Sequence, residues 1–209
     1  MYGFSVLSCQ QTQALRLNSL CRSSSPSQSQ SVFFLSGTFG LEGWFVADFG
    51  VDFKYKNDPP NNKEIKSKSF PSLRAVFDQP WNSVKSRMFN ISPTYVKSRI
   101  LRTFIDKYNR YPTTTTADDL VLLKAITSEL LVANGMAGDE GFLASLNLDT
   151  LPLIATAENV MVCSTLGSFL AQEVIKGVSL SGEPGFNVCV CNGDDCSVKA
   201  IPMTAVSTS

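Results

Sequence analysis

The chain has 209 residues, and its 18 basic side chains balance 18 acidic ones. No global field therefore favours nucleic acid or an anionic membrane, and a partner must be recognised through shape and local contacts. The absence of histidine excludes Ser–His and Cys–His catalysis and most zinc hydrolases. No apolar run approaches the roughly 20 residues that span a bilayer, and the start lacks the pattern of a signal peptide. We expect a soluble, intracellular protein with no membrane or nucleic-acid partner.

Residues 1–56 have the pattern of an α/β sheet. Apolar residues recur at the spacing of one helix face over 14–21, which predicts a short helix. The serine-rich stretch 23–31 predicts a surface loop. Short β-rich runs predict strands at 4–9, 32–36, 44–48 and 51–55. A strand, a helix and further strands in this order are typical of half of an α/β sheet.

The chain changes character in its middle third. Residues 57–69 are polar, with almost no apolar anchors, and we interpret them as a linker. Residues 70–150 show helical patterns and are interpreted as a helical insertion. Its predicted helices cover 70–77, 92–108 and 117–134. Ser92 and Pro93 suit the start of the second helix, and Gly135 suits the end of the third.

Residues 151–209 combine a long helical pattern with a β-hairpin. The helix is predicted over 155–178, where apolar residues form a broad face that we expect to be buried. Two β-rich runs, 186–191 and 197–201, flank an Asn-Gly pair, and Asn-Gly is the strongest short hairpin signal. We therefore expect a long helix followed by two paired strands.

The apolar face of the long helix is wider than a single contact needs. Small residues four apart also let another helix approach closely. Two interpretations stay open: core packing inside one chain, or core on one side and a subunit contact on the other. For the second, the expected interface residues are Leu166, Gly167, Leu170, Ala171 and Val174.

The sequence offers little catalytic chemistry. Glycines at 37, 40 and 43 have the spacing GxxGxxG, which is not that of a phosphate loop, so a tight turn is the better interpretation. Acidic pairs at helix starts or loops favour dipole or solvent contacts; they are 118–119, 139–140 and 194–195. A carboxylate or magnesium site among them remains an alternative. We expect no catalytic, cofactor-binding or metal-binding residue in this chain.

The basic residues and the cysteines also favour structural roles. The basic positions are expected on the solvated sides of helices, with an anion-binding patch as the alternative; they are 85, 87, 97, 99 and 102. The cysteines form no CxxC unit and fit no zinc spacing. We favour buried thiols or strand residues over disulfides at positions 9, 21, 163, 189, 191 and 196.

Four segments resemble the small, non-thioester subunit of SUMO-activating enzymes, within the ubiquitin-activating enzyme superfamily. Residues 11–22 (QTQALRLNSLCR) are similar to a helix of the type Gln-x-x-Arg-(Leu/Val)-Asn-x-x-Cys-Arg. Residues 33–48 (FFLSGTFGLEGWFVAD) resemble the strand, glycine turn and strand that come next. Residues 92–112 resemble a helix that ends in a Gly-Arg-x-Pro element. Residues 166–176 (LGSFLAQEVIK) are similar to a helix that the whole superfamily shares.

The resemblance implies an α/β fold: the C-terminal part of a ThiF/MoeB-like adenylating-enzyme fold, a partial sheet with packed helices. Residues 1–56 would be the remaining part of its nucleotide-binding-like sheet. It implies a regulatory or structural subunit of a heterodimer whose large subunit binds ATP and magnesium, holds the catalytic cysteine and activates SUMO. The expected partners are that large subunit and, through the complex, SUMO. The expected location is the nucleus, with some protein in the cytoplasm.

The chain also departs from the family. It begins where the family is already well into its sheet, and no residue matches the arginine that the family's N-terminal helix brings to the partner's ATP site. We therefore expect an N-terminally truncated form. Alternatives are a subunit or fragment of an activating enzyme for ubiquitin or another ubiquitin-like modifier, and a homodimeric ThiF/MoeB-like adenylating enzyme. The homodimer needs a phosphate loop on the same chain, which the sequence lacks.

Overall fold

The computed structural model shows a mixed α/β protein with a partial antiparallel sheet and packed helices, which confirms the predicted fold class. It describes residues 10–23, 31–56, 65–84, 91–114, 117–185, 187–201 and 203. The predicted strand at 4–9 and most of the predicted loop at 23–31 lie outside the described residues. Cys9 and the basic positions 85 and 87 lie outside them as well.

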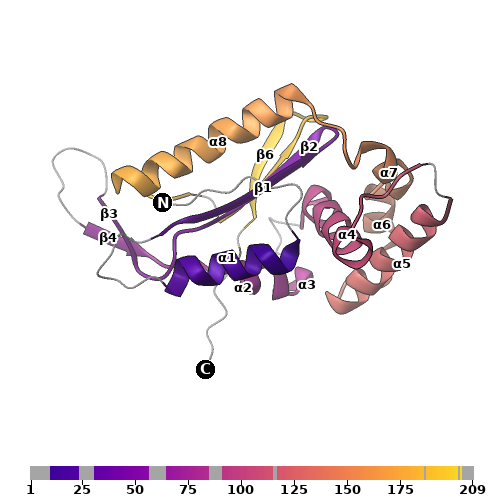
Figure 1. Ribbon diagram of the computed structural model, residues 1–209, viewed down its shortest axis with the longest axis horizontal. Helices are drawn as coiled ribbons and strands as arrows, with labels where there is room; N and C mark the ends of the chain where they lie inside the picture. The colour runs from indigo at the N-terminus through magenta and orange to yellow at the C-terminus, as the bar shows by residue number, and fades with distance from the viewer. Residues whose placement is uncertain are drawn as a thin grey trace.

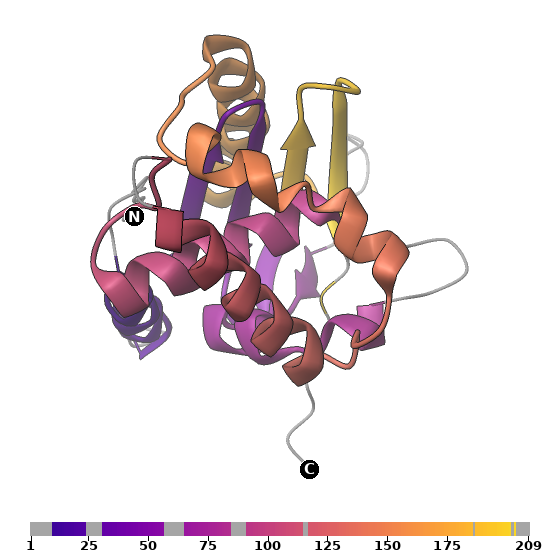
Figure 2. The same cartoon turned by 90° about the vertical axis from the view of Figure 1, so that its right-hand side faces the viewer.

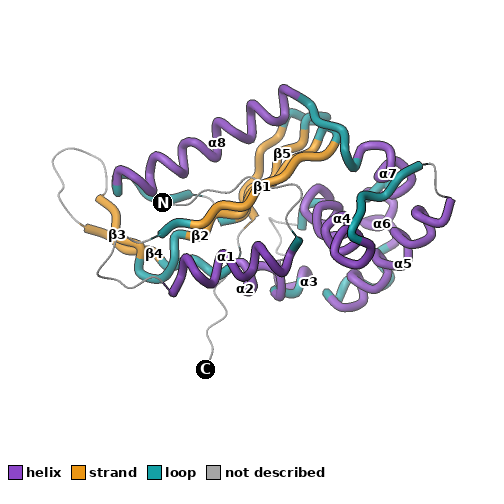
Figure 3. The backbone as a smooth tube through the Cα atoms, in the orientation of Figure 1, coloured by secondary structure: helices purple, strands orange, loops and turns teal. Residues whose placement is uncertain are grey.

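A four-stranded antiparallel sheet lies at the centre of the molecule (Figure 1). Its strands, in spatial order, are β1 (Phe33–Phe39), β2 (Glu42–Asp48), β5 (Val188–Asn192) and β6 (Ser197–Ile201). The tube in Figure 3 shows the β1–β2 hairpin and the later strand β5 running side by side. The sheet therefore brings together the N-terminal and C-terminal parts of the chain, and the predicted C-terminal hairpin is confirmed.

A separate two-stranded sheet is formed by β3 (Phe53–Lys56) and β4 (Ile65–Lys68). The prediction of a linker at 57–69 is wrong for the part that forms β4. Most of the side chains of β4 are polar and exposed, so no apolar alternation marks it in the sequence. The backbone ladder with β3 holds this strand in place.

Helices cover both faces of the central sheet and one of its ends (Figures 1 and 2). Figure 1 shows α8 on one face, α1 to α3 on the other, and α4 to α7 gathered at one end. Their bounds are α1 Gln11–Ser23, α2 Leu73–Asp78, α3 Trp81–Val84, α4 Pro93–Tyr108, α5 Ala117–Ala133, α6 Glu140–Ser145, the 3-10 turn η1 Leu148–Thr150, α7 Leu151–Ile154 and α8 Val160–Ser179. Among the helices described, none combines the length and the apolar character needed to cross a membrane.

Local capping decides where the helices begin and end. The predicted helices at 92–108 and 117–134 are confirmed as α4 and α5. The long helix begins later than predicted, because Asn159 Oδ1 accepts hydrogen bonds from the amides of Met161 at 2.9 Å and Val162 at 3.3 Å. The cap places the first turn at Val160, and α7 with a short loop occupies the preceding residues.

Each face of the sheet has its own hydrophobic core, because successive residues of a strand point to opposite faces. Trp44 and Val190, which pair across β2 and β5, belong to a large core together with residues of α1 to α7. Phe45 and Cys189, the next pair, belong to a small core together with residues of α8. The register of the two strands thus assigns each side chain to one of the two cores.

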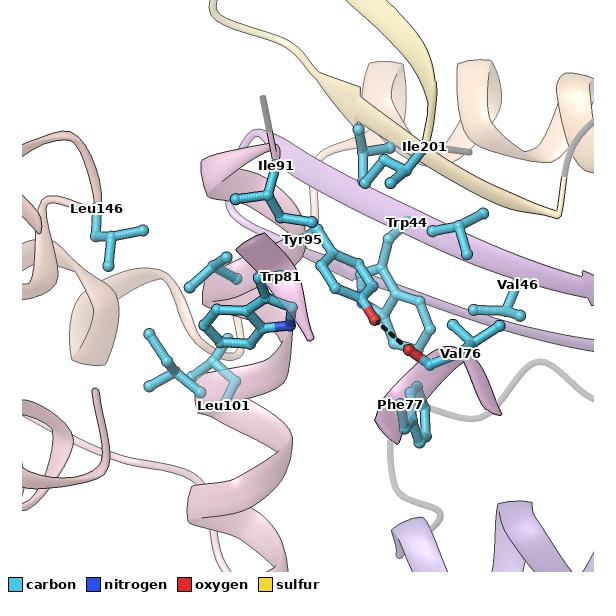
Figure 4. Packing of buried hydrophobic residues seen from close by; sticks show 14 of the residues in the cluster. Trp44, Val46, Val76, Phe77, Trp81, Ile91, Tyr95, Leu101, Leu146 and Ile201 are labelled. Carbon is cyan, nitrogen blue, oxygen red and sulfur yellow. Dashed lines mark hydrogen bonds between the residues drawn. The ribbon is translucent and has the colours of Figure 1, made fainter. Parts of the chain in front are cut away.

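The large core fixes the short helices against the sheet (Figure 4). Trp81 of α3 and Tyr95 of α4 are almost fully buried in it, and Trp44 of β2 lies beside the tyrosine. The Tyr95 hydroxyl donates a hydrogen bond to the carbonyl of Val76 at 3.3 Å. Burial raises the pKa of this phenol, so it remains a neutral donor that joins α4 to α2.

A buried carboxylate joins α1 to the sheet. Asp48 Oδ1 accepts hydrogen bonds from Arg22 Nη1 at 2.6 Å and the Gly50 amide at 2.8 Å, and its Oδ2 accepts one from Asn18 Nδ2 at 2.7 Å. Asn18 in turn accepts a hydrogen bond from the Leu73 amide at 3.0 Å. One aspartate therefore positions α1, the end of β2 and, through Asn18, the start of α2.

Candidate subunit interface

The inner side of α8 packs on the sheet. Val162 and Leu166 are buried in the small core, and Phe169, Leu170 and Val174 are partly buried against it. Removing a leucine side chain from water contributes about 2 kcal/mol. The inner side is thus held on the sheet by ordinary apolar packing within this chain.

The outer side of α8 is apolar and exposed. Val160 near the start is 84% exposed and Val178 near the end is 64% exposed. At 3.6 residues per turn, Val160, Gly167, Ala171, Ile175 and Val178 fall on one stripe along the helix. A helix of 20 residues is about 30 Å long. Exposed apolar residues gathered on one side of a helix are typical of interaction sites, and we call this stripe the outer stripe.

The structure divides the five predicted interface residues between the two sides of α8. Leu166 is buried, and Leu170 and Val174 pack against the same core, so these three hold the helix on the sheet. Gly167 and Ala171 lie on the exposed side. Their part in a subunit contact stays a prediction.

The expectation that the whole apolar face is buried is wrong for the outer stripe. Val160, Ile175 and Val178 were assigned to the buried face, and all three are exposed. On a helical wheel of the sequence, these three residues lie on the side opposite Val162 and Leu166, so the sequence already distinguishes the two groups. The apolar residues of α8 thus lie on two opposite sides of the helix, one packed on the sheet and one exposed.

Gly167 is not required by the packing of this chain. A Cβ atom built at this position meets no other atom within 4 Å. Glycine in a helix interior is less favourable than alanine by about 1 kcal/mol. The outer stripe therefore has open space beside Gly167, which a larger side chain could occupy.

Glu173 has a structural role on the same helix. Its side chain is fully buried, accepts a hydrogen bond from the Gly185 amide at 3.0 Å, and pairs with Lys176 Nζ at 2.7 Å. Glu173 therefore ties the end of α8 to the loop that leads into β5. This contact gives the glutamate of the Ala-Gln-Glu segment an anchoring role.

The predicted glycine turn is confirmed and forms no phosphate loop. Gly40 lies in the β1–β2 turn with φ +55°, a conformation that glycine adopts easily. A Cβ at Gly43 would lie 3.1 Å from Leu166 and 3.2 Å from Val162. The glycines thus allow a tight turn and a close approach of α8 to the sheet.

Two of the acidic pairs act within the fold. Asp119 forms two hydrogen bonds of 2.6 Å with the Arg110 guanidinium and accepts one from the Thr113 amide at 2.9 Å. These bonds, led by that with Arg110, lower the pKa of Asp119. Asp139 caps α6 by accepting a hydrogen bond from the Phe142 amide at 3.0 Å. Within the described ranges, no group of three or more His, Cys, Asp and Glu side chains could hold a metal ion.

The basic residues of α4 are not on a solvated side, so that prediction is wrong. Lys97 pairs with the buried Glu42, and Arg102 is itself buried. The Arg99 guanidinium lies 3.9 Å from the centre of the Phe77 ring, and burial lowers its pKa. Long aliphatic stems and a planar guanidinium let such residues pack inside a protein, which charge counting along a sequence does not reveal.

The described cysteines are all free: Cys21, Cys163, Cys189, Cys191 and Cys196. The prediction of buried thiols or strand residues is confirmed for Cys189 and Cys191 in β5 and is wrong for Cys163 and Cys196. Cys163 on α8 and Cys196 in the β5–β6 turn are exposed. Burial, helped by the neighbouring Cys191, raises the pKa of Cys189 to about 12. Cys189 beneath α8 is therefore an inert core residue.

The structure describes a mixed α/β protein whose fold is consistent with that of an α/β adenylating enzyme. No protein-family profile matches the chain. It is similar to subunit 1A of the SUMO-activating enzyme of Arabidopsis thaliana, with 28% identity over 144 residues, 69% of this chain and 43% of that protein. Subunit 1 of the SUMO-activating enzyme of Bos taurus is 25% identical over 215 residues, 88% of this chain and 58% of that protein.

Subunit 1 of the SUMO-activating enzyme of Danio rerio is 24% identical over 212 residues, 88% of this chain and 58% of that protein. The resemblance to the small subunit of SUMO-activating enzymes, given above from four segments, is therefore confirmed. The chain spans about half the length of the curated relatives it matches.

Proposed function

We propose that this chain is the non-catalytic small subunit of a heterodimeric SUMO-activating enzyme. In this proposal the large subunit binds ATP and magnesium, adenylates SUMO and carries it as a thioester, and this chain supports that subunit's fold. The observation that carries the proposal is the outer stripe of α8, an exposed apolar surface on a helix whose segment resembles the family. The structural contacts of Asp119 and Asp139 agree with a supporting role.

The contact is tested by co-expression with the large subunit of a SUMO-activating enzyme, followed by co-purification. Gly167→Leu places a bulky side chain on the outer stripe at an exposed position where a Cβ atom meets no other atom within 4 Å. We expect this variant to fold like the wild type and to bind the large subunit at least tenfold more weakly. Ala125→Leu, at an exposed position of α5, is the matched control and should bind as the wild type does.

Wild-type affinity of the Gly167→Leu variant would show that the outer stripe is not the contact. Activity is measured separately, as ATP-dependent formation of the SUMO thioester by the purified complex. A complex with thioester activity supports the whole proposal. A complex without activity supports the contact and contradicts the activating role. ATP–pyrophosphate exchange by this chain alone would instead favour the homodimeric adenylating enzyme.

A further inference from the structure

A second surface feature lies away from the outer stripe. A polar pocket of about 320 Å³ is located between the β5–β6 turn and the first turn of α4. It is lined by hydroxyl, amide and charged groups, including three carboxylates and two ammonium groups. The pocket uses the sheet face on which α4 packs, whereas α8 covers the opposite face. A ligand of this pocket is therefore independent of the contact proposed for α8.

The inner wall of the pocket contains a carboxylate with unused hydrogen-bonding capacity. Glu42 begins β2 and is only 4% exposed. Its Oε1 pairs with Lys97 Nζ of α4, and its Oε2 has no hydrogen-bond partner among the described residues. A buried charged oxygen without a donor is unfavourable by roughly 1–3 kcal/mol or more. The missing partner is a hydrogen-bond donor.

The outer wall of the pocket carries further negative charge. Asp194 and Asp195 are exposed in the β5–β6 turn. Asp195 accepts a hydrogen bond from the Ser197 amide at 3.0 Å and lies 3.8 Å from Lys199 Nζ, and these contacts, led by Ser197, lower its pKa. For the Asp194 carboxylate the structure records no ion pair within the described ranges. The two lysines of the pocket, Lys97 and Lys199, are thus paired with carboxylates, and the negative charge of Asp194 remains.

The first turn of α4 contributes positive electrostatic potential to the pocket. Ser92 is the N-cap residue but its side chain makes no capping hydrogen bond, so the positive end of the helix dipole faces this region. That feature alone would favour an anion. Glu42 already supplies a carboxylate paired with Lys97 near this helix end, and the lining as a whole has one more negative than positive group.

We propose that this pocket binds a cationic side chain, a lysine or an arginine, presented by a partner protein. A guanidinium or ammonium group supplies the donors that Glu42 Oε2 lacks and neutralises Asp194. Hydrogen bonds between ionised groups are roughly twice as strong as neutral ones, and the guanidinium of arginine offers five N–H donors. The proposal does not depend on SUMO activation, since it rests on the residues of the pocket alone.

The test uses the full chain labelled with ¹⁵N, alone or in complex with an unlabelled large subunit. The probe is Nα-acetyl-arginine methylamide, and the matched neutral probe is the citrulline analogue. We expect saturable amide shifts at 192–197 and 94–97 with the arginine probe, and none with the citrulline probe. Asp194→Asn, an exposed substitution, should weaken the arginine probe at least threefold.

Glu42→Gln removes the buried charge but keeps an oxygen for Lys97, and it should weaken the arginine probe about tenfold. Glu129→Gln, which removes an exposed acid of α5, is the control and should leave binding unchanged. Equal shifts with the citrulline probe would overturn the proposal. Amide shifts at 92–97 with acetate and none with the arginine probe would also overturn the proposal, because the pocket would then be an anion site. Unaltered binding of the arginine probe by the Asp194→Asn variant would likewise contradict the proposal. This exposed substitution does not disturb the core, so the variant tests the pocket alone.

Discussion

The two faces of the sheet are covered in different ways. On one face and at one end of the sheet, α1 to α7 surround the large core. On the other, α8 alone covers the small core and exposes an apolar stripe on its far side. A layer of helices can bury apolar side chains between its members, but a single helix buries only the side that faces the sheet.

Polar anchors show the same asymmetry. The large layer contains the Asp48 network and the pair between Arg110 and Asp119, both formed within the chain. The described polar anchors of α8 lie near its ends, at the Asn159 cap and at Glu173. Both anchors of the large layer are thus formed inside the chain, whereas the outer stripe of α8 is left exposed.

The largest expected difference separates two cysteines on the two sides of α8. With its pKa raised to about 12, Cys189 has about one thiolate in 10⁴ molecules at pH 8, and it is also buried. Cys163 is exposed. We expect iodoacetamide to label Cys163 at least a hundredfold faster, as measured by mass spectrometry of peptides. Comparable rates would mean that α8 does not stay on the sheet.

Loss of the Asp48 carboxylate should destabilise the large layer strongly. Asp48→Ala leaves Arg22 and Asn18 without their shared partner, and breaking a buried pair in this way costs about 3–5 kcal/mol. Urea denaturation measures the free energy of unfolding. The control Glu129→Ala removes one member of an exposed pair and should change it by less than about 1 kcal/mol. A small effect at Asp48 would show that α1 is held by packing alone.

Substitutions on the two sides of α8 should differ in their effect on stability. Leu166→Ala in the small core should lower the free energy of unfolding by about 2–4 kcal/mol. Val160→Ala on the outer stripe should change it by less than about 0.5 kcal/mol. Both values come from the same denaturation experiment on the isolated chain. Similar losses at the two positions would mean that the outer stripe is covered in the isolated chain.

The smallest expected effect concerns the pH dependence of the large layer. The pKa of Asp119 is lowered in the folded chain, mainly by Arg110, so its stabilising contribution is present above about pH 4 and is lost as the pH falls through the folded pKa. Asp119→Asn should therefore be less stable than the wild type at pH 6, and the gap should shrink below pH 4. The Asp118→Asn variant, changed at the neighbouring exposed position, should show no such difference in stability from the wild type. Denaturation at several pH values measures both variants.

Prediction from the sequence succeeded where the signal is local. The Asn-Gly pair gave the β5–β6 hairpin, and proline with serine before it gave the start of α4. Prediction from the sequence failed where contacts between distant segments determine the structure. β4 forms because β3 offers a backbone ladder, and Arg99 is buried because Phe77 lies beneath it. The pocket around Glu42 joins four distant segments, so no single stretch of sequence contains it.

The sequence by itself determined the absence of histidine chemistry, the α/β class and the resemblance to small subunits of SUMO-activating enzymes. These depend on composition, on periodicity and on short motifs, which need no knowledge of neighbours in space. The tertiary structure decided which side of α8 is buried and which acidic pairs have partners. Burial and pairing depend on which distant segments meet across the sheet, and that information is present only once the chain is folded.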